Sequence, residues 1–125
     1  MASKYHEAMR SVLRRIFDGF YIEEEKSMYI EGSRNFKAKK YHVDFFIPAL
    51  NICFEVDGEH HFEEVDYTGN KSEARVNYEK RVKLDNLKND IAEENGWYMI
   101  RVPYTLFKDE EKLEEYIREK YREVI

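Results

Sequence analysis

Two carboxylates, Asp44 and Glu55, occur in the sequence where together they could bind a divalent cation. They lie in two apolar segments, residues 41–47 (YHVDFFI) and 51–58 (NICFEVDG), separated by a short stretch containing Pro48, which predict a β-hairpin. Pairing residues whose numbers sum to 99 makes one face wholly apolar. The pairs on this face are Val43 with Val56, Phe45 with Phe54 and Ile47 with Ile52. A shift of one residue would mix polar and apolar side chains, so this register is favoured.

The same register sets polar side chains against each other on the opposite face. Its pairs are His42 with Asp57, Asp44 with Glu55 and Phe46 with Cys53. Directly opposed residues have Cβ atoms about 4.5–5.5 Å apart, so two like charges there destabilise the sheet unless something compensates. Mg²⁺ or Mn²⁺ would compensate, because such ions take carboxylate oxygens and use substrate phosphates as further ligands. Asp57 would extend the site by a third carboxylate, and the Val56 carbonyl is a further candidate ligand.

Histidines near the hairpin add a candidate base. His61 follows the turn at Gly58, close enough to the carboxylates to take a proton from water or to orient it. A zinc site built from His42, His60, His61 and Asp57 is a weaker alternative, because the spacing is poor and there is no cysteine pair. We therefore expect a hard cation held by carboxylates.

A second set of candidates lies on a helix predicted from about Glu73, with Gly96 as the C′ residue that ends it. Its apolar stripe consists of Leu84, Leu87 and Ile91. Lys88 lies between members of this stripe, and Arg81, Asp85 and Lys88 form one ridge of the helix. A cation directed at the carboxylates could stabilise the negative charge that develops on a phosphate during transfer.

These segments together resemble a known family. The order VDF, FEVDGEHHF, a helix with Asp85 and Lys88, and NGWYMIRVPY resembles the PD-(D/E)XK nuclease superfamily. More narrowly, it is similar to the branch of very-short-patch-repair and phage-encoded homing endonucleases, whose signature is written EDxHD. The likeness covers residues 42–104 and implies a metal-dependent phosphodiesterase acting on DNA. The site residues that it implies are Asp44 as the metal-binding aspartate, Glu55 as the acid of the next strand, His61 as the histidine and Asp85 as the aspartate of the later helix.

The sequence departs from the family pattern at the lysine. That lysine is expected two residues after Glu55, where this chain has Asp57. Lys88 could take over its role, or His61 could replace it.

Two further departures lie closer to the N-terminus. Val43 precedes Asp44 where the family has proline, and the position of the family's first-helix glutamate is occupied by His6, with Glu7 adjacent and turned towards solvent. The helix itself is predicted in the first twenty residues, with Ser3 as N-cap, by apolar residues at helical spacing. These residues are Tyr5, Met9, Val12, Leu13, Ile16, Phe17 and Phe20.

Other segments complete the predicted fold. We expect a short strand around 27–30, a strand from Trp97 to Tyr104 stopped by Pro103, and a last helix from Leu106 to the C-terminus. The prediction is one α/β domain, residues 1–125, with a small mixed sheet flanked by helices in the order α-β-β-β-α-β-α. The resemblance implies a restriction-endonuclease-like arrangement of these elements.

The composition of the chain limits the class of protein to which it can belong. The chain has 125 residues and a formal net charge of −5, enough length for one hydrophobic core. With the single Cys53 no internal disulfide can form, and with no apolar run of membrane-spanning length or signal-peptide pattern we expect an intracellular, cytoplasmic protein without membrane contact.

One local stretch reverses the acidic balance. Residues 32–43 contain no acid, and their basic side chains are candidates for DNA binding. These candidates are Arg34, Lys37, Lys39 and Lys40. Net acidity argues against strong non-specific binding, so a fused or separate DNA-binding element, or a homodimer, is expected to assist.

The leading hypothesis is therefore a Mg²⁺- or Mn²⁺-dependent DNA endonuclease of homing or repair type, encoded by a phage or mobile element. An alternative is a catalytically inactive module of the same fold that binds nucleic acid or a partner protein. A third hypothesis is a junction- or mismatch-processing nuclease.

Overall fold

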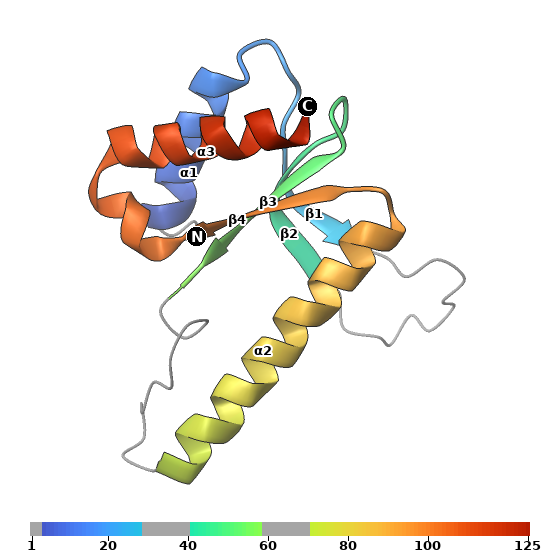
Figure 1. The fold of residues 1–125 in the computed structure, drawn as a ribbon, viewed down its shortest axis with the longest axis vertical. Coiled ribbons are helices and arrows are strands. Elements are labelled where there is room, and N and C mark those ends of the chain that lie inside the picture. Colours follow the sequence, from blue (N-terminus) through green and yellow to red (C-terminus); the bar gives the residue numbers. More distant parts are fainter. Residues whose placement is uncertain (1–3, 29–40, 59–70) are drawn as a thin grey trace.

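The computed structural model describes residues 4–28, 41–58 and 71–125. In these residues the chain is a mixed α/β fold, as predicted (Figure 1). The elements in order are α1 (Lys4–Ile16), β1 (Glu23–Met28), β2 (Tyr41–Ile47), β3 (Ile52–Asp57), α2 (Lys71–Glu94), β4 (Tyr98–Pro103), the 3₁₀ helix η2 (Tyr104–Lys108) and α3 (Glu110–Val124). No helix among the described residues is long and apolar enough to cross a membrane.

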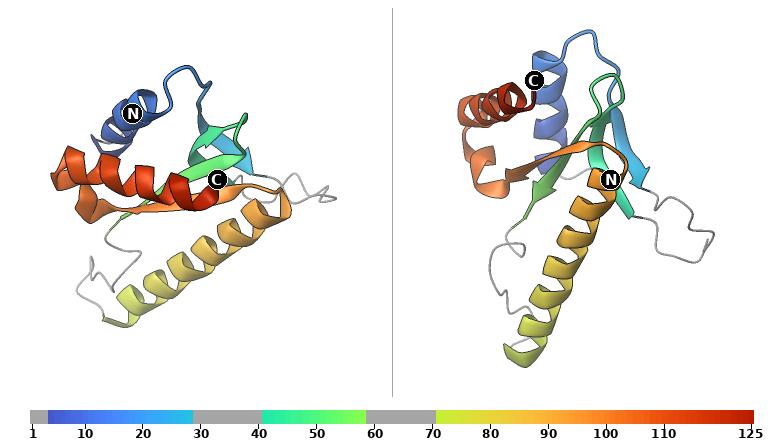
Figure 2. Two further views of the ribbon diagram at one scale, coloured as in Figure 1. Left: turned by 45° about the horizontal axis from the view of Figure 1, so that its top comes forward. Right: turned by 45° about the vertical axis from the view of Figure 1, so that its right-hand side comes forward.

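The four strands form one mixed sheet in the order β1-β2-β3-β4. The pairs β1–β2 and β2–β3 are antiparallel, whereas β3 and β4 run parallel and are connected through α2. Helices α1 and α3 lie together on one side of the sheet, and α2 lies on the other (Figure 2). The site residues predicted on β3 and α2 therefore belong to adjoining layers.

The hairpin of β2 and β3 has the predicted register near its turn. Its paired residues are Phe45 with Phe54, Phe46 with Cys53 and Ile47 with Ile52. Beyond them the strands separate, and the Val56 backbone N–H donates to a carboxylate oxygen of Asp44 at 2.8 Å. The predicted continuation, with Val43 opposite Val56, Asp44 opposite Glu55 and His42 opposite Asp57, does not form in the described strands, because a side chain has become the acceptor.

Strand β2 also changes face at Asp44. Val43 was expected on the apolar face with Phe45, but it packs in the cluster that contains Phe46 and faces α2. The register of β1 and β2 places Glu25 beside Asp44, and Glu25 has a left-handed φ of 51°. Residues two apart on a regular strand share a face, so the backbone must be irregular at this point. A non-glycine residue at such a φ costs about 1–2 kcal/mol.

Two apolar clusters cover the faces of the sheet. The larger lies against α1 and α3, and its members are Met9, Val12, Leu13, Phe17, Phe45, Ile47, Ile52, Phe54, Ile100, Val102, Leu113 and Ile117. The smaller lies against α2, and its members are Met28, Val43, Phe46, Cys53, Ile91 and Ala92. The expected place of Phe20 on the buried face is wrong, because α1 ends at Ile16 and leaves Phe20 42% exposed.

Some predicted boundaries are wrong by a few residues. The strand expected around 27–30 lies at Glu23–Met28, and the last helix begins at Glu110 and not at Leu106. Asp109 sets this start, because its carboxylate accepts from the backbone N–H groups of Glu111 and Lys112 as an N-cap does. Ser3 lies outside the described residues.

Helix α2 ends at Gly96 as predicted. Gly96 has φ of 74°, its N–H donates to the Glu93 carbonyl, and the Trp97 N–H donates to the Ala92 carbonyl at 2.8 Å. This is the hydrogen-bond pattern of a Schellman motif, in which a left-handed residue follows the helix.

A Gly96→Ala variant should be about 1 kcal/mol less stable than the wild type, because a Cβ disfavours this φ. No heavy atom lies within 4 Å of the added Cβ, so the loss reports the backbone alone. Urea unfolding measures it, with Gly96→Asn as control, since asparagine tolerates the left-handed region. Equal stability of the alanine variant and the wild type would contradict the assignment.

Candidate active site

Glu55 and Lys88 form a buried ion pair between β3 and α2. The Lys88 Nζ donates to Oε1 of Glu55 at 3.0 Å, and the residues are only 9% and 6% exposed. The expectation that Lys88 turns towards the core is confirmed. The second oxygen, Oε2 of Glu55, is buried and has no hydrogen-bond partner among the described residues. A buried polar atom without a partner costs about 1–3 kcal/mol, so a cation or donor placed there would be favourable.

The Glu55 carboxyl holds its proton to unusually high pH. Burial raises its pKa most, the Asp44 charge raises it further, and Lys88 and Arg101 oppose the rise, leaving a pKa of about 7 against an ordinary 4.5. At neutral pH the carboxyl is thus divided between its protonated and ionised forms. A divalent cation bound by the carboxylate would compete with that proton and stabilise the ionised form.

Asp44 lies where β2 and β3 separate. One of its oxygens accepts from the Val56 N–H at 2.8 Å, which fixes the carboxylate beside β3. Its charge acts on Glu55, as the raised pKa of Glu55 records. The charge of Asp44 therefore reaches Glu55 from an irregular point of the sheet, next to the strained backbone of Glu25. Strained backbone of this kind is concentrated at functional sites.

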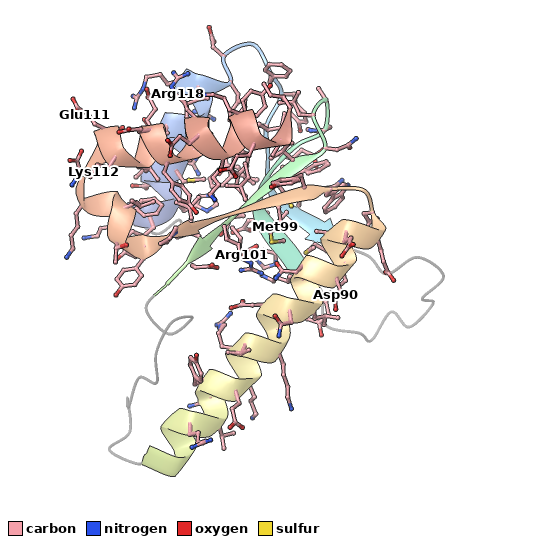
Figure 3. The ribbon with its side chains drawn as sticks, viewed as in Figure 1. Asp90, Met99, Arg101, Glu111, Lys112 and Arg118 are labelled. Carbon is pink, nitrogen blue, oxygen red and sulfur yellow. The ribbon has the colours of Figure 1, made fainter. Side chains whose placement is uncertain are left out.

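Sequence reasoning missed Arg101, the charged residue in the middle of β4. It is the parallel partner of Glu55 in the sheet, and its side chain joins β3 to α2 (Figure 3). Its Nη1 donates to Asp57 at 2.7 Å and lies 3.8 Å from the Asp85 carboxylate. Its Nη2 donates to the Asp85 backbone carbonyl, and its Nε donates to Asn89, both at 2.9 Å. Two features of the sequence could have indicated Arg101. One is that it is the single charge in the strand YMIRVPY, and the other is that a right-handed crossover is expected between parallel strands, which places a helix over the sheet.

Arg101 interacts with Asp57 and Asp85, two of the predicted site residues. Asp57 is 7% exposed and is held by this guanidinium, so its carboxylate is already compensated without a metal. Asp85 interacts with Arg101, whereas Lys88 forms its ion pair with Glu55. In the described part of the chain, no three His, Cys, Asp or Glu side chains are grouped as metal ligands. Asp44 and Glu55 remain the two candidate ligands, since the charge of Asp44 acts on Glu55.

His6 and Glu7, the candidate residues of α1, lie on the side of the sheet opposite to α2. His6 bonds to Glu24 at 2.8 Å and stacks on Phe45 with ring centroids 4.4 Å apart. Arg10 also binds Glu24, and this bond is the main reason that the pKa of Glu24 falls to about 2. Glu7 is exposed, as expected. His6 therefore takes part in a hydrogen-bonded cluster with Glu24 and Arg10 on the α1 side of the sheet, whereas Glu55 faces α2.

The remaining predicted residues divide into two groups. Arg81 is half-buried on α2, and His42 is exposed on β2. Those outside the described residues are the histidines His60 and His61 and the basic candidates Arg34, Lys37, Lys39 and Lys40. Their predicted roles stay predictions, as does the zinc alternative.

The raised pKa of Glu55 predicts how stability depends on pH without divalent ions. Folded Glu55 keeps its proton to pH 7, whereas the unfolded chain releases it near 4.5, so stability should fall by up to about 3 kcal/mol as pH rises between these values. Glu24 acts oppositely, because its lowered pKa means that stability is lost below pH 4.5 as pH falls towards 2. Urea unfolding in EDTA measures both. Subtracting the Glu55→Gln profile isolates Glu55, and an unchanged slope in that variant would contradict the assignment.

Comparison with known proteins gives one partial similarity. A 64-residue part of the chain, 51% of its length, is 34% identical to "Uncharacterized protein 033L" of Invertebrate iridescent virus 3. The match covers 31% of that viral protein, so the chain spans about a third of the length of its relative. No family model and no solved structure matches the chain.

Proposed function

We propose that this chain is a metal-dependent DNA endonuclease domain with a restriction-endonuclease-like arrangement. The observation that carries the proposal is the buried Glu55 carboxylate, which has Lys88 on one oxygen, no described partner on the other, and Asp44 in its electrostatic field. The sequence resemblance supports the same reading. The residues fit a hard cation, because a carboxylate oxygen without a donor is the kind of ligand that Mg²⁺ or Mn²⁺ takes.

In this proposal Asp44 and Glu55 hold Mg²⁺ or Mn²⁺, which when bound lowers the pKa of water and supplies positive charge to a phosphate. Asp44 is oriented by the Val56 N–H, so its free oxygen keeps a fixed direction. Lys88 fixes Glu55 and offers its ammonium to the negative charge that develops on the scissile phosphate. Lys88 thereby takes the role of the lysine that Asp57 replaces. His61, from outside the described residues, is the proposed base.

The test is cleavage of supercoiled, linear and branched DNA by the wild type and by Asp44→Ala, with Mg²⁺, with Mn²⁺ and with EDTA. We expect cleavage by the wild type only with a divalent ion, and none by Asp44→Ala. Asp90→Ala, which removes an exposed acid of α2, should cleave as the wild type does. If the wild type and Asp44→Ala are equally inert on every substrate, the chain is not a nuclease. Preference for branched substrates would favour the junction- or mismatch-processing alternative.

A second candidate function has an observation of its own. Arg101 already compensates Asp57, at the position where the family has its lysine, and this arrangement would suit an inactive module of the same fold. Calorimetry with Mn²⁺ separates the two. An active site should bind the ion and lose it on Glu55→Gln, whereas an inactive module need not bind it.

A further inference from the structure

Only part of the long helix α2 packs against the sheet. Its buried side chains among the described residues are Lys88, Ile91 and Ala92, in the C-terminal half. Residues 75–83 are exposed or half-buried, and Val76 is 47% exposed. All three ribbon views show the N-terminal half of α2 extending away from the sheet (Figures 1 and 2). A helix segment that packs so little against the described sheet needs another explanation for its composition.

The extended segment is basic in an acidic protein. Residues 75–83 carry four basic side chains and one acidic one, whereas the whole chain has a net charge of −5. Arg75 pairs with Glu79 at 3.2 Å. Among the residues that the structure describes, the other three cations, Lys80, Arg81 and Lys83, have no ion-pair partner. The segment thus presents three positive charges that no described acidic side chain pairs with.

One of these charges, that of Arg81, continues the line of the candidate site along α2. Arg81 precedes Lys88 by seven residues, which is close to two helical turns, so both lie on nearly the same side of α2 about 10 Å apart. That separation equals about three steps of a nucleic-acid strand at about 3.4 Å each. Lys88 in turn touches Glu55. A strand lying along α2 would therefore reach the carboxylates.

We infer that residues 75–83 of α2 bind the phosphate backbone of DNA and lead the strand to the site of Glu55 and Lys88. This inference rests on the proposed function and extends it by naming a DNA-contacting surface. Charge complementarity favours a polyanion as occupant. An acidic protein partner is disfavoured, because protein-docking helices present an apolar stripe, and in this segment Val76 is the one large apolar side chain that is exposed.

The test compares two variants that each remove three positive charges. Lys80→Gln/Arg81→Gln/Lys83→Gln alters the extended segment. Arg118→Gln/Lys120→Gln/Arg122→Gln alters α3, across the sheet from α2 (Figure 3). Glutamine has a helix propensity close to that of lysine and arginine, so circular dichroism should show unchanged helix content. Fluorescence polarisation with a labelled duplex, in EDTA and over a range of NaCl, measures binding without cleavage.

We expect the α2 variant to bind at least about tenfold more weakly, with the slope of log K against log salt reduced by about 2–3, and the α3 variant to bind within about twofold of the wild type. The inference is overturned if the α2 variant binds DNA as tightly as the wild type does, or if both variants lose the same affinity. It is also overturned if the wild type binds a poly-glutamate peptide but not DNA. Binding of this pattern by a wild type that cannot cleave would overturn the nuclease proposal and leave the inference standing.

Discussion

A Lys88→Met variant will be about 1–2 kcal/mol less stable than the wild type at pH 8, and adding Glu55→Gln will restore most of the loss. Lys88 donates a hydrogen bond to the 6% exposed Glu55 carboxylate, and without it Glu55, whose pKa is already about 7, must take up a proton at pH 8 at a cost of about 1.4 kcal/mol. The loss will be smaller at pH 5, because Glu55 then carries its proton in the wild type as well. The double variant has no buried charge at this position, and such replacements of a whole pair are often close to neutral.

Urea unfolding of the wild type, both single variants and the double variant at pH 8 and pH 5 gives the coupling energy. The matched control is Lys83→Met, an exposed lysine of the same helix, which should change stability by no more than about 0.5 kcal/mol. If Lys88→Met costs no more than Lys83→Met, the pair does not exist in solution.

The parts of the fold that follow from local rules were predictable. Alternation of apolar residues fixed the register of Phe45 with Phe54, and a glycine in a left-handed conformation fixed the end of α2 at Gly96. Both depend on a few neighbouring residues. The element order followed from the same patterns, and the described residues confirm it.

The irregular point of the sheet was not predictable from periodicity. Asp44 interrupts the hairpin because its side chain binds the Val56 N–H, and a period-2 pattern assumes that only backbone groups pair. Val43 then changes face, which no alternation rule anticipates. The charge of Asp44 still acts on Glu55, although the ladder pairing from which their proximity was argued does not form.

One ion pair of the candidate site could be predicted from a single segment, and the other could not. Lys88 was identified because a lysine within an apolar stripe needs a buried partner, and that partner is Glu55. Arg101 was missed, because its contacts with Asp57 and Asp85 require the parallel register of β3 and β4 together with the placement of α2. Contacts that join three elements are not contained in the spacing of any one segment.

The Glu55→Gln/Lys88→Met double variant separates folding from catalysis. Its expected stability is near that of the wild type, yet it lacks both the carboxylate proposed to hold the cation and the ammonium beside it. Loss of groups that stabilise charge at a phosphate is worth several kcal/mol, so DNA cleavage in Mg²⁺ should be slower by about 10³-fold or more. Because the fold is retained, this loss cannot be ascribed to unfolding.

Cleavage rates of the wild type, both single variants and the double variant, at matched folded fractions and pH 8, test this expectation. Calorimetry on the same samples should show that Mn²⁺ binding disappears in Glu55→Gln and in the double variant but survives in Lys88→Met, because the carboxylates and not the ammonium are the proposed ligands. Lys112→Met, an exposed lysine of α3 outside the proposed DNA-binding segment, serves as the control for losing a lysine. If the double variant cleaves within about tenfold of the wild type, Glu55 is not a ligand of the catalytic cation. Asp44, beside the strained residue Glu25, would then have to bind that cation with a different carboxylate.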